Sequence, residues 1–362
     1  MIGRPFTRAM NAGSGLSRRA GMGRPAGACL HLRTAALPSV CYTPAMPDLQ
    51  ALLAQHRADA LRHCYRMMGC YADAEDLTQD TLLGAWEAQE SWRGQGPFRS
   101  WLLAIATNTC LQALDRHPPV LLPQLERPPA PPGTPLEELE SSRWITPAPD
   151  ARLFPNAHQT PERRETVALA FLAMLQRLPA QQRAALLLED VVGMSADEIA
   201  ATLDLTLPAV NSALQRAREA MGAYSPPPLL PDDPPPEVLR EYVRAWEERD
   251  LDRLTALLRE GVILAMPPRA VWFRGRDAAA QLFQSPRFQE FWASGLRIGL
   301  TRANGLPALG FYAGLTEGNL HSIGVTRFEG GQVAEMTVFI GPHFLAGFDL
   351  LGSGRLLDPS LA

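Results

Sequence analysis

Two proline-rich stretches set the strongest limit on how this chain of 362 residues can fold. Twelve prolines lie within residues 118–161, and seven lie within residues 226–236. Because proline lacks a backbone N–H and fixes φ, both stretches are expected to be linkers, too rich in proline to supply core elements. This interpretation divides the chain into an N-terminal segment, three folded units, two linkers and a tail, at residues 1–46, 47–117, 118–161, 162–224, 225–236, 237–345 and 346–362.

Composition excludes several classes of protein. Apolar residues make up 46% and charged residues 20% of the chain, which is near the globular average and argues against wholesale disorder. A transmembrane helix needs about 18 consecutive apolar residues. The sequence contains no such run, so no membrane association is expected. The net charge of −4 excludes a generally basic nucleic-acid coat. All 34 basic residues are arginine, and with the abundant Ala, Pro and Gly this indicates a GC-rich, bacterial genome.

The cysteines predict neither a disulfide framework nor a metal site. They are odd in number, include no CxxC pair, and lie at Cys29, Cys41, Cys64, Cys70 and Cys110. His56, His63 and Cys70 repeat at seven-residue spacing, but no carboxylate or second cysteine completes a ligand set, so we expect them to pack in a core. The expected location is the cytoplasm, with no cofactor and no bound metal.

The first 46 residues contain six arginines and no acidic residue. They are interpreted as a disordered arm, or as the product of an upstream start codon with Met46 as the true initiator. An arginine-rich transit peptide is the alternative, and it is disfavoured because the segment lacks a clear amphipathic period.

The first folded unit contains a strongly acidic helix at residues 72–87. Its inward positions are expected to be Leu77, Leu82 (or Thr81), Ala85 and Trp86. Its other face carries a compact group of polar and acidic side chains, Asp73, Glu75, Asp76, Gln79 and Asp80. A solvated face is the ordinary interpretation of such a group. Its density also suits docking to an arginine-rich partner.

A loop at residues 91–98 leads into an apolar helix at residues 99–116. Trp92, Phe98 and Trp101 cluster around this junction together with Arg93. Aromatic rings beside an arginine are suited to stacking on unpaired bases. A satellite aromatic core explains the same spacing, and both interpretations stay open.

The second unit has the pattern of a helix-turn-helix. Helices are expected at residues 198–203 and 207–218, with Asp204 in the tight left-handed turn and Thr206 as the N-cap of the second helix. The outward positions of this second helix are Ala209, Asn211, Ser212, Gln215, Arg216 and Arg218. Asn and Gln can read adenine, and Arg can read guanine or bind phosphate. A purely structural helical hairpin is the alternative.

Neither helical unit has the charge to bind DNA strongly by itself. Residues 47–117 hold six arginines against nine acidic residues, and residues 162–224 hold six against eight. Counterion release therefore contributes little to binding, and a larger, positively charged partner is required.

Three segments together resemble a known family. DAEDLTQDTLLGAWE, FRSWLLAIATNTCLQALD and LPAQQRAALLLEDVVGMSADEIAATLDLTLPAVNSALQRARE are similar to the sigma-70 factors of the extracytoplasmic-function (ECF) group, over residues 49–117 and 162–222. The resemblance implies two all-α domains. The first would bind core RNA polymerase and recognise the −10 promoter element, and the second would read the −35 element.

The resemblance also implies roles for individual residues. The surface that docks on the β′ coiled coil of the polymerase would be Asp73, Glu75, Asp76, Gln79 and Asp80. Contacts to −10 DNA would come from Trp92, Arg93, Phe98, Arg99, Trp101 and Asn108. Contacts to −35 DNA would come from Asn211, Ser212, Gln215, Arg216 and Arg218.

The last unit has a different texture. An amphipathic stretch at residues 236–260 is followed by short strands at 262–266 and 271–273, and by a hairpin at 323–328 and 333–340 closed by Gly330 and Gly331. Helices followed by a curved antiparallel sheet form an α+β fold. WEERDLDRLTALLREGVILAMPP, WFRGRDAA and TRANGLPALGFY resemble the SnoaL-like domain, a cone-shaped α+β fold, over residues 235–345.

The cone could in principle hold an active site. Polar candidates inside it are Asp277, Glu317, His321, Glu335 and His343. No pairing of a base with an orienting partner can be read from the sequence, so catalysis is not expected. Trp246, Met266, Trp272, Phe273, Phe283, Phe291 and Trp292 are candidates for an apolar pocket, with an ordinary core as the alternative.

The sequence therefore predicts a bacterial transcription initiation factor that is not an enzyme. Its partners would be core RNA polymerase, promoter DNA and a possible small-molecule ligand of the C-terminal domain, which would regulate activity. One alternative is a DNA-binding regulator that acts without polymerase. The other is a SnoaL-type enzyme with a regulatory N-terminus.

Overall fold

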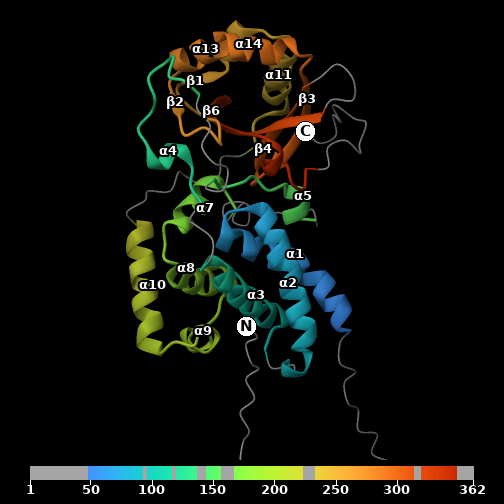
Figure 1. Cartoon of the computed structure of the whole chain (residues 1–362), viewed down its shortest axis with the longest axis vertical. Helices are drawn as coiled ribbons and strands as arrows, with labels where there is room; N and C mark the ends of the chain where they lie inside the picture. Colours follow the sequence, from blue (N-terminus) through green and yellow to red (C-terminus); the bar gives the residue numbers. More distant parts are fainter. Residues whose placement is uncertain are drawn as a thin grey trace, which may run out of the picture. The chain divides into compact units, whose positions relative to one another are not determined.

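Three helices form the first helical domain of the computed structural model (Figure 1). They are α1 (Leu49–Met68), α2 (Tyr71–Glu87) and α3 (Phe98–Leu114). The structure describes residues 48–92, 96–115, 120–136, 144–155, 167–222, 233–313 and 319–348, which belong to one compact unit; residues 1–46 lie outside the described part. The Asp48 side chain caps α1 by accepting from the Gln50 backbone N–H at 3.0 Å. Gly69, at φ 71°, ends the helix in the left-handed conformation that glycine adopts without strain.

The second helical domain confirms the predicted helix-turn-helix. Its elements are α7 (Leu169–Gln176), α8 (Ala180–Leu187), the π-helix η3 (Leu188–Val192), α9 (Ala196–Leu203) and α10 (Leu207–Gly222). Ser195 and Glu198 form a capping box at the start of α9. Asp204 adopts the expected left-handed turn at φ 51°, ψ 48°. The core-facing side of α10 is buried at Val210, Ala213, Leu214 and Ala217.

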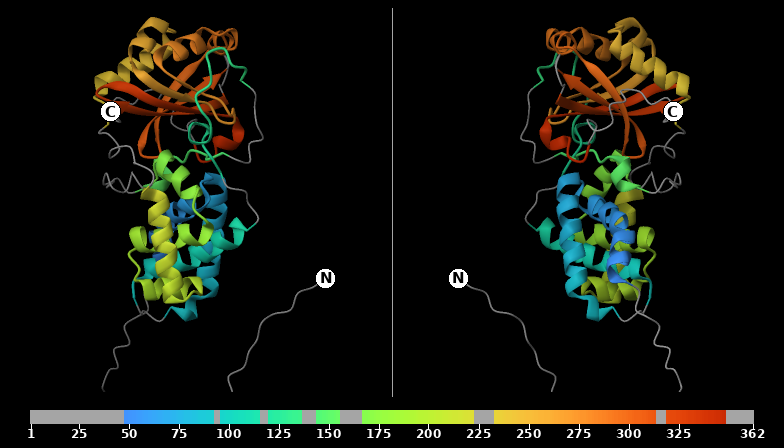
Figure 2. Two further views of the ribbon diagram at one scale, coloured as in Figure 1. Left: turned by 90° about the vertical axis from the view of Figure 1, so that its left-hand side faces the viewer. Right: turned by 90° about the vertical axis from the view of Figure 1, so that its right-hand side faces the viewer.

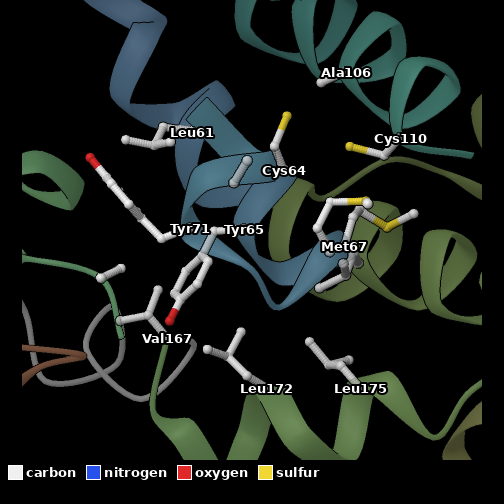
Figure 3. Packing of buried hydrophobic residues seen from close by; sticks show 14 of the residues in the cluster. Leu61, Cys64, Tyr65, Met67, Tyr71, Ala106, Cys110, Val167, Leu172 and Leu175 are labelled. Atoms are coloured by element: carbon white, nitrogen blue, oxygen red, sulfur yellow. The ribbon is translucent and has the colours of Figure 1, made fainter. Parts of the chain in front are cut away.

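The two helical domains share one hydrophobic core. Figure 3 shows side chains from α1, α3 and α7 packed in one cluster, including Met67, Cys110 and Leu172. A polar contact reinforces the junction, because the buried Arg183 guanidinium donates to the Met67 carbonyl at the end of α1. Burial lowers the pKa of Arg183 to about 10, so the guanidinium is still charged at pH 7. Its hydrogen bonds to carbonyl oxygens stabilise this charge.

Part of the first proline-rich stretch contributes to this core, so the expectation that it supplies no core element is wrong. Trp144, Ile145 and Leu153 are buried. The extended backbone makes its hydrogen bonds with α1 and its flanks: the Thr146 N–H donates to the Gly69 carbonyl at 3.1 Å. The prolines limit helices here to single turns, but they do not prevent burial where other backbone groups find partners. The short helices α4 (Pro123–Glu126) and α5 (Asp150–Leu153) lie in the same stretch.

The C-terminal domain has the predicted α+β architecture. Its helices are α11 (Pro236–Glu247), α12 (Leu251–Ala256), α13 (Arg276–Gln284) and α14 (Pro286–Ala293). Its strands are β1 (Leu258–Ala265), β2 (Trp272–Arg274), β3 (Arg297–Ala303), β4 (Leu306–Ala313), β5 (Asn319–Glu329) and β6 (Gln332–Ile340). Figures 1 and 2 show α11, α13 and α14 along one side of the curved sheet.

The sheet is mixed, which corrects the antiparallel expectation. Its strand order is β2-β1-β6-β5-β4-β3, and β1 pairs with β6 in parallel. The predicted hairpin is confirmed, since β5 and β6 pair antiparallel around Gly330 and Gly331. The parallel pair joins strands far apart in the sequence, a pairing that local patterns do not reveal. A short 3₁₀ turn, η4 (Pro342–Phe344), follows the sheet.

One buried histidine gives the first domain a pH-dependent stability. The Thr107 hydroxyl donates to the Leu103 carbonyl at 2.7 Å, so the His63 Nε2–H donates to the Thr107 Oγ1 at 2.8 Å. Among the described residues, His63 Nδ1 has no hydrogen-bond partner. Burial, with smaller contributions from Arg66 and Arg99, lowers the pKa of His63 to about 3. The imidazole is therefore neutral in the folded protein.

Acidification should destabilise the fold through this group. Below pH 6.5 the unfolded chain binds a proton that folded His63 excludes, so the free energy of unfolding falls as pH decreases from about 6.5 toward 3. Between pH 7 and pH 5 the expected loss is about 2 kcal/mol. Urea denaturation of the wild type and of His63→Gln at both pH values checks this. An equal pH dependence in the two proteins would contradict it.

Candidate functional site

The outer surface of α2 combines acidic and apolar side chains. Asp76, Gln79 and Asp80 are exposed, and they continue at helical spacing into Leu83 and Trp86, which are 64% and 51% exposed. We call these five residues the α2 stripe. Large exposed apolar side chains beside carboxylates are typical of a protein-binding surface.

The inward orientation expected for Trp86 is therefore wrong. After Tyr71 at the start of α2, the buried residues of the helix are small: Ala74, Thr78, Thr81 and Ala85. Small side chains allow α1 and α3 to approach closely, and the two threonine hydroxyls are satisfied by carbonyls four residues earlier in the helix. Trp86 lies beyond this narrow contact. Residue type alone favoured burial of the tryptophan, which is why the sequence analysis missed it.

The other two residues of the predicted docking set, Asp73 and Glu75, are only partly exposed. Glu75 accepts hydrogen bonds from Arg57 Nη2 at 2.6 Å and from the Tyr71 hydroxyl at 2.8 Å. It thus ties α2 to α1 inside the first domain, while Asp76 and Asp80 are presented to solvent.

The residues predicted for −10 DNA fall into two groups. Phe98 is buried, and its ring centroid lies 5.0 Å from that of Trp92 and 5.3 Å from that of Trp101. These aromatics pack as a small cluster against the main core. Asn108 is exposed farther along α3. Arg93 lies outside the described residues.

Arg99 extends from α3 toward the second helical domain. Its Nε lies 3.3 Å from Asp59 Oδ1, and its Nη1 lies 3.5 Å from the Val192 carbonyl. In this arrangement Arg99 connects α1, α3 and the end of η3. Its cationic head is therefore engaged within the protein.

The predicted −35 residues lie together on the outer surface of α10. Asn211, Gln215, Arg216 and Arg218 are exposed, and Ser212 is partly so. Arg218 is held by ion pairs to two acids of η3, Glu189 and Asp190, which raise its pKa. Gln215 Nε2 donates to Glu219 Oε1 at 2.9 Å.

The C-terminal domain contains a partly open cavity of about 480 Å³ between its sheet and the helices α11, α13 and α14. Among the predicted pocket residues, Trp246, Met266, Phe283 and Phe291 line it, whereas Trp272, Phe273 and Trp292 are buried elsewhere in the core. Among the polar candidates, only His321 is found to line the cavity. Asp277 and His343 are exposed, Glu335 accepts from Gln124 Nε2 at 3.1 Å, and Glu317 lies outside the described residues.

Sequence reasoning missed the most consequential polar residue, Asn304. It lies in the β3–β4 turn at φ 55° and is fully buried. Its Nδ2 donates to the Tyr65 hydroxyl oxygen at 2.8 Å and to the Val167 carbonyl at 2.7 Å. Its Oδ1 accepts from the Ala148 N–H at 3.0 Å. An Asn-Gly dipeptide favours a tight turn between strands, but nothing in the sequence indicates partners so distant along the chain.

A second set of contacts surrounds this turn. The Gly305 N–H donates to Asp150 Oδ1 at 2.9 Å, and Arg302 Nε lies 3.5 Å from the other carboxylate oxygen. Phe344 and Phe348 belong to the same hydrophobic core as the helical domains. The sheet of the C-terminal domain therefore docks on the helical domains through both polar and apolar groups.

Family comparisons account for the two helical domains. Residues 52–118 match the model described as Sigma-70 region 2, and residues 168–221 match Sigma-70, region 4. These regions, on the folds described above, define a sigma-70 type transcription initiation factor. The ECF RNA polymerase sigma factor SigG of Mycobacterium tuberculosis is 37% identical over 315 residues, covering 84% of each chain. The chain belongs to the ECF RNA polymerase sigma factors.

Solved structures extend the likeness to the third domain. The crystal structure of the ECF sigma factor SigJ of M. tuberculosis covers 82% of this chain and 98% of its own, at 21% identity and a TM-score of 0.50, which shows a shared fold. A SnoaL-like protein of Burkholderia thailandensis covers 29% of this chain and 93% of its own, with 16% identity and a TM-score of 0.24.

The protein binds core RNA polymerase and directs it to promoters through regions 2 and 4, which catalyse no reaction themselves. Its C-terminal domain has the α+β fold described above, and the likeness in fold to SigJ extends into it. Within the part of the chain that the structure describes, no helix combines the length and apolar character needed to cross a bilayer.

Proposed function

We propose that this sigma factor docks on polymerase through the α2 stripe and reads −35 DNA through the outer face of α10. We further propose that its C-terminal domain regulates this activity and does not catalyse a reaction. The observation that carries the proposal is the separation of these features. The α2 stripe and the outer face of α10 are exposed to solvent on the two helical domains. The contacts of the C-terminal domain with these two domains are buried elsewhere. The factor acts in the cytoplasm, where its polymerase partner works.

The docking role rests on the chemistry of the α2 stripe. Asp76 and Asp80 can each accept charge-assisted hydrogen bonds from arginines of a partner. Leu83 and Trp86 supply apolar area beside them, and exposed tryptophan is typical of the residues that dominate protein interfaces. Glu75 contributes mainly by fixing the orientation of α2 through Arg57, and the partly exposed Asp73 lies beside the α2 stripe.

Reversing charge on the α2 stripe should weaken polymerase binding without unfolding the domain. Each charge-assisted contact contributes about 1.5–3 kcal/mol, so Asp76→Arg with Asp80→Arg should raise the Kd for core polymerase at least tenfold. Trp86→Ala should weaken binding as well, through lost apolar contact.

Fluorescence anisotropy with labelled sigma factor measures these affinities. Glu260→Arg is the matched control, because Glu260 is an exposed acid on β1 of another domain. If both reversals leave the affinity at the wild-type value, the docking assignment is wrong.

DNA reading is assigned to exposed side chains of α10 and α3. Asn211, Ser212, Gln215, Arg216 and Arg218 lie on one face of a helix that follows a helix-turn-helix turn, where base edges are contacted. On α3, Asn108 is the most accessible of the −10 residues. The proposed −10 surface is completed by Trp92, Arg93, Phe98, Arg99 and Trp101. Because Phe98 is packed in the aromatic cluster, this cluster must loosen before the Phe98 ring can contact a base.

Substitution of the α10 readers should reduce transcription from −35-dependent promoters. A lost base contact costs about 1–3 kcal/mol, which corresponds to roughly 5- to 150-fold. Gln215→Ala should alter sequence preference. Arg218→Ala should weaken binding, and Asp190→Asn, which removes one of its two ion-pair partners, should strengthen it.

In vitro transcription on a promoter library measures these effects. Arg240→Ala, at an exposed position on α11, serves as control. Wild-type activity of Gln215→Ala and Arg218→Ala on every promoter would exclude α10 as the reader.

Regulation is argued from the closed arrangement of the helical domains. Elements centred at −35 and −10 lie about 25 base pairs apart, roughly 85 Å along B-DNA. The two domains share one core here, with Arg183 of α8 bonded to the end of α1. They must separate to read both elements at once. Asn304 holds Tyr65 of the first domain and Val167 at the start of the second, so the C-terminal domain stabilises the closed form.

Releasing this contact should therefore raise activity. Asn304→Gly keeps the left-handed turn but removes the side chain that joins the domains. We expect transcription with core polymerase to increase several-fold at limiting sigma factor.

Arg249→Gly is the matched control, because Arg249 also has a positive φ of 57° in the C-terminal domain but is exposed. Unchanged transcription by Asn304→Gly at every concentration would remove the regulatory role.

A catalytic role for the C-terminal domain finds less support. His321 has one described hydrogen-bond neighbour, Ser322 Oγ at 3.3 Å, and no carboxylate orients its ring among the described lining residues. Glu290 is the single carboxylate among those residues, and it is exposed. A base without an orienting partner is a weak catalyst. We therefore propose binding rather than turnover in this cavity.

A further inference from the structure

The cavity of the C-terminal domain has the size and lining of a small-molecule site. Its volume of about 480 Å³ lies within the range of ligand pockets. Most of its wall is aromatic or aliphatic, including Trp246, Phe283, Phe288, Phe291 and Phe311. Apolar cavities much smaller than this one bind apolar molecules readily.

The polar side chains of the lining include two cations, Arg269 and the exposed Arg287. Arg269 lines the cavity from the loop after β1 and is buried. His321 lines it from β5, and its ring centroid lies 4.9 Å from that of Phe291, with the two rings tilted at 42° to each other. Burial, and then the charge of Arg269, lower the pKa of His321. The imidazole is therefore neutral at pH 7, and the guanidinium beside it supplies positive charge.

One wall of the cavity comes from outside the C-terminal domain. Leu136 belongs to the stretch that joins the two helical domains, yet it lines the cavity and packs against the core of the C-terminal domain. The chain is tied down just before it: Trp272 Nε1 donates to the Arg127 carbonyl at 2.7 Å, and the Ala130 N–H donates to the Trp272 carbonyl at 2.8 Å. Residues 133–136 also border a smaller cavity against α13 and α14.

We propose that this cavity binds a small apolar carboxylate, whose acid group faces Arg269 and His321 and whose hydrocarbon part contacts Leu136. An arginine in an apolar site favours a carboxylate by charge and by paired hydrogen bonds, and it disfavours an ammonium group. Because Leu136 is part of the connection between regions 2 and 4, occupancy of the cavity changes the contacts of that connection. The regulatory consequence rests on the function proposed above; the binding site does not.

Binding is tested first with the full chain and without polymerase. Isothermal titration calorimetry with decanoate, decan-1-ol and decyltrimethylammonium compares three head groups on one hydrocarbon chain. The expected order of affinity is decanoate, then decanol, then the ammonium, with at least a tenfold difference between the first and last. Equal affinities, or no saturable binding of decanoate, would overturn the proposal.

Variants locate the site. Arg269→Gln should abolish the preference for decanoate over decanol, and Val338→Phe should block both by filling the cavity. Circular dichroism melting confirms that each variant is folded. If Arg269→Gln fails to fold, the comparison of head groups on the wild type still decides the carboxylate preference.

The contribution of Leu136 has a matched control. Leu136→Ala should weaken decanoate binding at least fivefold, whereas Leu125→Ala, a partly buried leucine of the same stretch that packs against the other core, should leave it within twofold. Equal effects of the two substitutions would remove Leu136 from the site.

Transcription separates this inference from the proposed regulation. Decanoate that binds as expected but leaves transcription unchanged contradicts the regulatory role and retains the site. An Asn304→Gly variant with altered transcription, in a protein that does not bind decanoate, retains the regulatory role and overturns the site.

Discussion

The arrangement of the three domains depends on the hydrogen bonds of one buried amide. The Asn304 side chain donates to Tyr65 and Val167 and accepts from Ala148, while its backbone N–H donates to the Ala148 carbonyl at 3.1 Å. A buried polar group left without partners costs about 1–3 kcal/mol. The turn therefore fits only where the two helical domains and their connecting stretch are already in place, and it holds them there.

This constraint changes the role of the proline-rich stretch between the helical domains. At one end it supplies Ile145 and Leu153 to the shared core, and in its middle it places Leu136 in the wall of the C-terminal cavity. The same chain segment thus contacts the domains that bind polymerase and DNA and the domain that carries the cavity. The proposed regulation would link a change at the cavity to a change in domain separation through this segment, without any need for catalysis.

The sequence predicted the elements far better than their contacts. The helix-turn-helix followed from local signals, since a left-handed Asp204 and a period of buried positions on α10 are properties of neighbouring residues. The β5–β6 hairpin followed from its Gly-Gly turn. The burial of Ile145, the parallel pairing of β1 with β6, and the partners of Asn304 are long-range contacts, for which periodicity and turn chemistry give no signal. The sequence predicted a buried Trp86 because tryptophan is usually buried. Its exposure is explained by a binding partner, which the fold of this chain alone does not reveal.

The candidate site shows the same division. The sequence predicted site residues on α2 and α10, and the structure shows which of them are accessible. Asp76 and Asp80 face solvent, whereas Glu75 is committed to Arg57 and Arg218 to Glu189. Those commitments depend on the packing of separate helices.

A double-mutant cycle between Tyr65 and Asn304 tests the central claim most directly. Urea denaturation of the full chain would give the free energy of unfolding for the wild type, Tyr65→Phe, Asn304→Gly and the double variant. If the Asn304 amide joins the C-terminal domain to the first helical domain through the Tyr65 hydroxyl, the two substitutions are coupled by about 1 kcal/mol. Additive effects, with coupling below about 0.3 kcal/mol, would contradict the account.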